Sequence, residues 1–197
     1  ELPAGWPAIP LARAHELLTA PGAPFEMSEV VIRGHRTRVW KNAPPTLRDV
    51  FIAGRTFGER IFLVHEDERV SFETFARASI ALAHWLQAQG VGKGDRVAIV
   101  MRNLPEWPVS FFASLLIGAI ATPLNGWWSG EELLYGLQDS GARILIADAE
   151  RYARIGEHVA ECPAVERVVV TRVDKALPEV IAFESIIGGP NDWAALP

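Results

Sequence analysis

The glycine-rich segment at residues 90–94 is the first candidate for ligand chemistry. Gly90, Gly92 and Gly94 form G-x-G-x-G, a pattern that invites comparison with the G-x-G-x-x-G loops that bind nucleotide phosphates. In those folds the glycines follow a strand and open a helix, so that the phosphates meet the helix N-terminus. Here the glycines close a predicted helix and lead into a predicted strand. We therefore interpret them as a structural loop, and the sequence contains no G-x-x-x-x-G-K-[ST] phosphate loop.

A second candidate is the segment Asn103-Leu104-Pro105-Glu106. It follows a predicted parallel strand, and open α/β sheets tend to bind ligands outside the carboxyl ends of their strands. A helix beginning there could also hold an anion. The simpler interpretation, which we favour, is that Asn103 caps the turn before the helix.

Two adjacent tryptophans, Trp127 and Trp128, form a third candidate after another predicted strand. Neighbouring side chains cannot both enter the same pocket. We expect one of them to pack inward and the other to be exposed or covered by a ligand or partner, because an uncovered apolar patch often marks an interface. Ordinary packing of both rings is the alternative.

Acid–base and metal chemistry have little support. Glu131 and Glu132 fall in the first turn of a predicted helix, where the helix dipole already favours carboxylates. Cys162 follows a predicted helix, and we interpret it as structural rather than catalytic. No metal site is expected, because none of the histidines lies at metal-ligand spacing from another or from the cysteine. The histidines are His15, His35, His65, His84 and His158.

Composition excludes several classes of protein. The chain has 197 residues, enough for one domain or one and a half, and 49% of them are hydrophobic, which argues against disorder. A net charge of -5 without a clustered basic face excludes a typical nucleic-acid binder. The apolar run at 109–121 is too short for a transmembrane segment. A single cysteine favours a reducing, cytoplasmic location.

The candidate segments are connected by elements of regular length. A helix is predicted from Ser71 to Gly90, and apolar strands then begin at intervals of 23, 24 and 24 residues, near Arg96, Ala119, Arg143 and Arg167. Each interval accommodates a strand, a turn and a crossover helix, as parallel strands require. The strands are apolar without alternation, which indicates that both faces of the sheet are covered. The fold class is therefore α/β, with a mainly parallel sheet and crossover helices.

The N-terminal region has a different pattern. Residues 30–33 and 36–40 predict a small antiparallel hairpin around Gly34-His35, and residues 61–65 and 69–72 predict a second one. Thr46 is a candidate cap for a helix that follows Pro44-Pro45. We expect an N-terminal extension at 1–58, with hairpin and helix, and an α/β subdomain at 59–197.

Residues 60–150 resemble the beginning of the adenylate-forming synthetases, which include acyl-CoA ligases, luciferases and the adenylation domains of peptide synthetases. The segments that carry the resemblance are S-F-E-T-F, R-V-A-I-V-M-R-N-L-P-E-W, L-L-I-G-A-I-A-T-P-L-N and E-E-L-L-Y-G-L-Q-D-S-G-A-R-I-L-I-A-D, in this order. The resemblance implies the N-terminal subdomain of that fold. It also implies a parent enzyme that activates a carboxylic acid with Mg-ATP as an acyl-adenylate and transfers the acyl group to CoA.

The family's Ser/Thr/Gly-rich loop ending in P-K-G, its adenine- and ribose-binding motifs and its catalytic lysine do not occur in this sequence. The resemblance therefore implies an incomplete AMP-binding domain that ends before the phosphate loop. We assign no catalytic residue, expect no ATP, Mg or CoA bound to the chain alone, and expect it to be inactive. The chain begins Glu-Leu-Pro rather than with Met, which suggests a trimmed or processed start.

The acetyl-CoA synthetase branch of the family implies one binding site. There the coenzyme's nucleotide rests on the loop after the second strand and the start of a later helix, which correspond here to Asn125-Gly126-Trp127 and residues 151–154. Gly126 would permit close approach, Trp127 would stack on adenine, and Arg151 or Arg154 would meet a phosphate. The sequence differs from that branch in its bulky tryptophans and displaced arginines, and simple solvation of the arginines is the alternative.

The segment N-G-W-W-S-G-E-E-L is similar to bacterial acyl-CoA ligases of the fatty-acid type, which implies a fatty acid as the carboxylate substrate. Two other functions stay open: a self-standing nucleotide- or CoA-binding module, and a non-catalytic scaffold or dimerisation unit. Apolar surface on an incomplete domain also favours self-association or a homodimer.

Overall fold

The computed structural model describes residues 8–197, and the chain divides into two compact units between Thr46 and Leu47. We expected the division at residue 59, and residues 1–7 of the expected extension lie outside the described part. The difference lies in α2 (Leu47–Arg55), because Phe51 on this helix is buried against Phe75 and Phe112 of the larger unit.

The smaller unit contains α1 (Leu11–Thr19) and a hairpin of β1 (Met27–Ile32) and β2 (His35–Trp40). The strands pair antiparallel, with Ile32 opposite His35. Arg33 and Gly34 form the two-residue turn with φ values of 50° and 86°, the left-handed geometry that matches the twist of a tight hairpin. The first predicted hairpin is thus confirmed.

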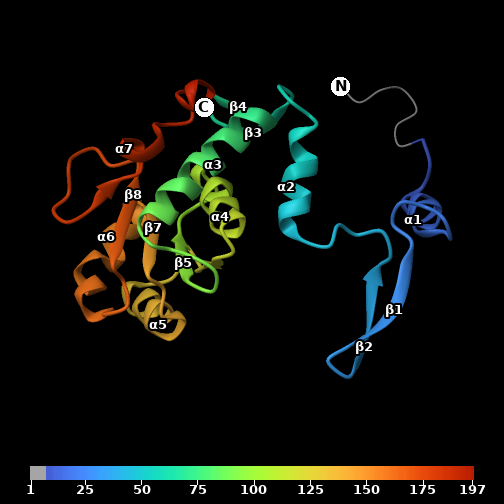
Figure 1. Cartoon of the computed structure of the whole chain (residues 1–197), viewed down its shortest axis with the longest axis horizontal. Helices are drawn as coiled ribbons and strands as arrows, with labels where there is room; N and C mark the ends of the chain where they lie inside the picture. Colours follow the sequence, from blue (N-terminus) through green and yellow to red (C-terminus); the bar gives the residue numbers. More distant parts are fainter. Residues whose placement is uncertain (1–7) are drawn as a thin grey trace. The chain divides into compact units, whose positions relative to one another are not determined.

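The larger unit is built on a five-stranded parallel sheet, shown in Figure 1. Its strands are β5 (Arg96–Val100), β6 (Ile120–Pro123), β7 (Ile144–Asp148), β8 (Arg167–Thr171) and β9 (Ile181–Ala182). The order is β6-β5-β7-β8-β9, and every neighbouring pair is parallel. The predicted parallel sheet is therefore confirmed, and the chain reverses its direction of winding between β5 and β7.

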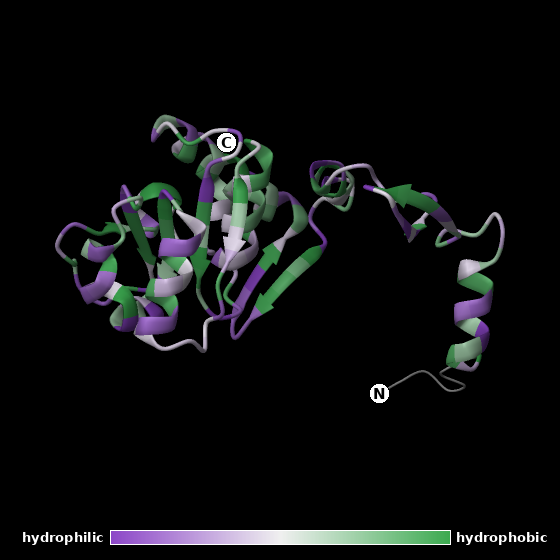
Figure 2. Ribbon diagram, turned by 90° about the horizontal axis from the view of Figure 1, so that it is seen from below, coloured by the Kyte–Doolittle hydropathy of each residue, from purple (hydrophilic) through white to green (hydrophobic). Residues whose placement is uncertain are grey.

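Helices cover both faces of this sheet. One core packs alternate strand residues, such as Val97 and Ile99, against α3 (Phe72–Ala88) and α4 (Glu106–Leu116). The residues between them, Ala98 and Val100, belong to a second core with α5 (Gly130–Ser140) and α6 (Ala149–Ile155). The strands are accordingly hydrophobic along their length, whereas the helices carry hydrophilic residues as well (Figure 2).

Short elements complete the larger unit. The second predicted hairpin is confirmed as β3 (Ile61–His65) and β4 (Glu68–Ser71), paired antiparallel. The remaining elements are the 3₁₀ turn η1 (Gly156–Glu161), α7 (Glu184–Ile187) and η2 (Trp193–Ala195).

Local side-chain chemistry fixes the ends of the helices. Ser71 caps α3 by accepting from the amide of Thr74, and Ser129 forms a capping box with Glu132 at α5. The 90–94 segment closes α3 and leads into β5, as predicted. It is held from within, since Gly92 donates its amide to Asp95 at 2.9 Å. Within residues 8–197 no helix is long and apolar enough to cross a membrane.

Candidate functional site

A cavity of about 520 Å³ lies at the carboxyl edge of the parallel sheet, where the chain leaves β5 and β6. This edge, next to the reversal of winding, is where open α/β folds bind ligands. The segments after β5 and β6 supply most of its wall, and His65, Trp107 and Arg151 complete it. The exposed polar and aromatic residues of its lining are Arg102, Asn103, Asn125 and Trp127.

Arg151 is a buried brace of this wall. Its side chain is only 4% exposed, and its Nε donates to the carbonyl oxygen of Gly126 at 2.9 Å. One of its terminal nitrogens, Nη1, donates to Glu150 at 2.8 Å and lies 3.6 Å from a carboxylate oxygen of Asp148. Asp148 also caps α6 by accepting from the amide of Arg151. The guanidinium thus fixes the loop after β6 to the start of α6.

Arg154 supports the same loop from one turn further along. Its Nη1 lies 3.3 Å from the carbonyl oxygens of both Gly126 and Trp128, and its Nη2 donates to Glu150 at 2.9 Å. A Cβ atom on Gly126 would lie 3.3 Å from the carbonyl oxygen of Met101 and 3.5 Å from Nε of Arg151. The Met101 carbonyl and the Arg151 side chain therefore occupy the space beside Gly126 that a side chain would need.

The two tryptophans point to different environments, which agrees with the prediction that one packs inward and the other is exposed. Trp128 is half-buried and packs against the second core beside α5, where its ring would lie 3.0 Å from a Cβ atom on Gly136. Trp127 is 84% exposed at the cavity, and the guanidinium carbon of Arg151 lies 5.8 Å from its ring centroid. Asn125 accepts from the amide of Trp127 at 3.0 Å, which sets the direction of the loop.

The four residues that the sequence singled out thus form one assembly. Gly126, Trp127 and Arg151 line the cavity, and Arg154 holds the loop from behind. The arginines make contacts within the chain that the sequence did not reveal, because carbonyl oxygens as acceptors leave no residue-type signal. Whether a ligand occupies the cavity stays a prediction.

Asn103 does not cap the turn, contrary to our interpretation of the sequence. Helix α4 follows Pro105 without a side-chain cap, and across residues 8–197 the Asn103 amide has no hydrogen-bond partner. The side chain of its neighbour Arg102 is likewise exposed and unpaired within the described range. Both side chains therefore remain available at the cavity.

An ion-pair cluster around a buried carboxylate lies at the same sheet edge and was not anticipated. Glu106 is fully buried, and its Oε1 accepts from Nε of Arg172 at 2.8 Å. Arg172 also donates to Glu68 at 2.9 Å. Burial lowers the pKa of Arg172, but the hydrogen bonds to Glu68 and Glu106 outweigh it and raise this pKa above its usual value. The cluster connects α4 and β4 to the end of β8, and its partners lie 66 and 104 residues apart in sequence. Local sequence patterns cannot predict contacts over such separations.

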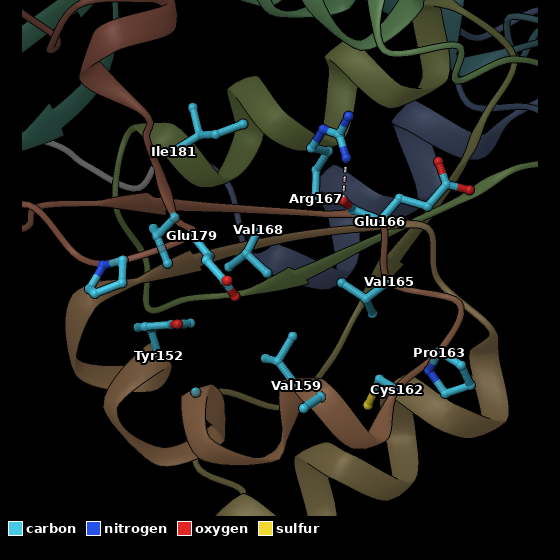
Figure 3. A pocket seen from close by; sticks show the side chains of 14 residues that line it. Tyr152, Val159, Cys162, Pro163, Val165, Glu166, Arg167, Val168, Glu179 and Ile181 are labelled. Carbon is cyan, nitrogen blue, oxygen red and sulfur yellow. Dashed lines mark hydrogen bonds between the residues drawn. The ribbon is translucent and has the colours of Figure 1, made fainter.

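A second cavity, of about 750 Å³, lies between β8, η1 and residues 178–181 (Figure 3). Cys162 lies at its floor and is 3% exposed, with its thiol near the carbonyl oxygen of His158. Desolvation, and then the charge of Glu161, raise the pKa of this thiol. These features agree with a structural cysteine. Residues 8–197 contain no group of three His, Cys, Asp or Glu side chains that could hold a metal ion.

Comparison with known proteins decides the family. Residues 50–188, more than half of the chain, match the family of AMP-binding enzymes. The chain belongs to this family. The resemblance seen in residues 60–150 is thereby confirmed.

Among curated AMP-binding relatives, a 3-hydroxybenzoate–CoA/4-hydroxybenzoate–CoA ligase of Thauera aromatica is 32% identical, over 67% of this chain and 25% of its own length. A long-chain-fatty-acid–CoA ligase of Salmonella typhimurium is 35% identical, over 64% of this chain and 22% of its own. The chain therefore spans about a quarter of the length of these relatives.

The solved structures show the same fold. Coronafacic acid ligase from Pectobacterium brasiliense superposes with a TM-score of 0.66 at 24% identity, over 73% of this chain and 29% of that one. The α/β subdomain is thus the N-terminal part of the adenylate-forming ligase fold.

Proposed function

We propose that this chain is the N-terminal framework of an ATP-dependent CoA ligase, which converts a carboxylate to an acyl-adenylate and transfers the acyl group to CoA. The family match and the names of the relatives support the reaction class. The observation that carries the role of this chain is the cavity at the carboxyl edge, with the exposed ring of Trp127 beside a braced loop.

In this proposal the nucleotide of CoA lies in that cavity. The exposed Trp127 indole provides a flat apolar surface on which adenine can stack. Gly126, Arg151 and Arg154 act through the loop, because the hydrogen bonds from the two arginines to the Gly126 carbonyl oxygen hold the backbone beneath the ring. This differs from the direct phosphate contact that the sequence suggested for the two arginines.

CoA binding to the chain tests this assignment. The sequence led us to expect no CoA on the chain alone, but the preformed cavity changes that expectation. We now expect the chain to bind CoA in calorimetric titration, and Trp127→Ala to weaken binding by roughly tenfold, the scale of one base–aromatic stack. Trp40→Ala is the matched control, since this half-exposed tryptophan lies in the hairpin of the other unit. Equal affinities of the Trp127→Ala and Trp40→Ala chains would refute the stacking role.

Among carboxylates, we propose a fatty acid as the substrate. The Salmonella relative and the N-G-W-W-S-G-E-E-L segment support this choice, whereas the Thauera relative acts on hydroxybenzoates. The whole enzyme is expected to show a higher kcat/KM with dodecanoate than with 4-hydroxybenzoate, and the opposite order would contradict the proposal.

The single reduced cysteine supports a cytoplasmic location.

Adenylation requires ATP and Mg, and we propose that residues outside this sequence hold them. The sequence contains no Ser/Thr/Gly-rich loop ending in P-K-G. The purified chain is therefore expected to catalyse no exchange between ATP and pyrophosphate, and clear exchange would contradict this division of roles. Self-association of the chain also remains a proposal, testable by sedimentation.

A further inference from the structure

Arg102 and Asn103 are the two polar residues of the cavity wall whose side chains form no hydrogen bond or ion pair with the rest of the described chain. Both are exposed at the carboxyl end of β5, and neither side chain has a partner within residues 8–197. Arg151, in contrast, is buried and its guanidinium serves the Gly126 carbonyl and Glu150. Arg102 is thus the available cation of this cavity.

The backbone beneath these two side chains is fixed. The amide of Arg102 donates to Oδ2 of Asp148 at 2.9 Å, and the carbonyl of Arg102 accepts from the amide of Leu104 at 2.7 Å. Met101 and Leu104, which flank the pair, are both buried. A fixed backbone limits the entropy lost when Arg102 and Asn103 bind a ligand, so the segment is preorganised.

The charge of the cavity favours an anion. Two arginines line it, and none of the described residues that line it is an aspartate or glutamate. This is informative in a chain whose net charge is -5. Asp148 is buried and accepts from the amides of Arg102 and Arg151, and the exposed Glu150 pairs with the Arg151 guanidinium, so neither carboxylate neutralises the side chain of Arg102.

We propose that Arg102 and Asn103 bind a phosphate group of the nucleotide whose base stacks on Trp127. The inference rests on the proposed CoA site and adds the residues that recognise its charge. A guanidinium presents paired N–H donors that match phosphate oxygens, and the Asn103 amide supplies a further donor beside it. The phosphate can be the terminal monoester or the diphosphate of the coenzyme, and both share this chemistry.

Calorimetric titration of the chain with CoA and dephospho-CoA tests the proposal. Arg102→Gln should weaken CoA binding by about tenfold or more, in line with loss of a charge-assisted hydrogen bond, and should reduce its dependence on salt. Arg102→Lys should retain the salt dependence. If the monoester is the ligand, Arg102→Gln will leave dephospho-CoA binding unchanged, whereas recognition of the diphosphate will weaken both ligands alike.

Arg167→Gln is the matched control, because this exposed arginine begins β8 at the opposite edge of the sheet. Thermal unfolding should show Arg102→Gln as stable as the unmodified chain, since the exposed side chain of Arg102 makes no hydrogen bond or ion pair within the described residues. CoA affinity and salt dependence unchanged by Arg102→Gln, with Trp127→Ala still weakening binding, would overturn this inference alone. Absence of CoA binding by the unmodified chain would overturn the proposed site together with it.

Discussion

The Nε atom of Arg151 donates a 2.9 Å hydrogen bond to the carbonyl oxygen of Gly126, which joins the start of α6 to the loop that carries Trp127. We predict that Arg151→Ala raises the KM for CoA in the whole enzyme by about tenfold, because a misplaced loop loses its preorganised geometry. ATP–pyrophosphate exchange by the whole enzyme should change little. Arg154→Ala should have a smaller effect, since this side chain is one-third exposed and its two carbonyl contacts are longer. An unchanged KM in both variants would contradict the role of the brace.

Gly126 faces a second constraint, from the neighbouring backbone. Gly126→Ala would place a Cβ atom 3.3 Å from the carbonyl oxygen of Met101, so the loop must shift. We predict a loss of about 1–3 kcal/mol in the free energy of unfolding, typical of overpacking. Gly92→Ala is the matched control, because a Cβ there meets nothing within 4 Å. Urea titrations that give the same midpoint for both variants would show that the close approach carries no cost.

Glu106 depends on Arg172 for its only ion pair in the described part of the chain. Arg172→Gln should cost about 3 kcal/mol of stability, at the lower end of the range for breaking a buried pair, because Arg172 is one-third exposed. The additional substitution Glu106→Gln should restore part of this loss, since it removes the uncompensated buried charge. A double variant no more stable than Arg172→Gln alone would exclude that explanation.

Arg143, Asp95 and Glu166 form an ion-pair cluster at the amino ends of the strands, and we predict that this cluster makes the protein less stable in acid. Arg143 donates to Asp95 at 2.7 Å and to Glu166 at 2.8 Å. The pKa of Asp95 is lowered, first by the Gly92 amide and also by Arg143, and the pKa of Glu166 is lowered chiefly by Arg143. Each carboxylate therefore stabilises the fold fully above its usual pKa, 3.8 for Asp95 and 4.5 for Glu166, and loses this contribution as the pH falls further.

Chemical denaturation between pH 3 and pH 7 measures this dependence. The unmodified chain should lose stability as the pH falls below about 4.5, and Arg143→Gln should flatten the profile in that window. Because Glu166 and Asp95 are solvent-accessible, added salt should reduce the difference between the two proteins. If the unmodified chain and Arg143→Gln lose stability equally over this pH range, the cluster is not the cause of the acid sensitivity.

The thiol of Cys162 should react slowly in the folded chain. It is 3% exposed, and its raised pKa keeps it protonated near neutral pH. Iodoacetamide at pH 7.5 is therefore expected to label it much more slowly in buffer than in denaturant. Equal rates would show that the second cavity exposes the sulfur.

The sequence predicted those parts of the fold that depend on local pattern. Regular strand spacing and unbroken apolar strands predicted the parallel sheet, and Ser71 and Gly90 predicted the two ends of α3. The brace of Arg151 and the cluster of Glu106 with Arg172 could not be predicted, because their partners are a backbone carbonyl and residues far away in sequence. Asn103 shows the converse, since a residue type that favours caps lies here in an uncapped turn.

The most direct test of the account is a nuclear magnetic resonance titration of the chain with CoA. We predict that the resonances of the Trp127 indole N–H, of the amides of residues 125–127 and of the Arg102 side chain shift together and saturate. The indole resonance of Trp40 should not shift. Saturable shifts confined to other residues, or no shifts at all, would contradict a coenzyme site at the carboxyl edge of this sheet.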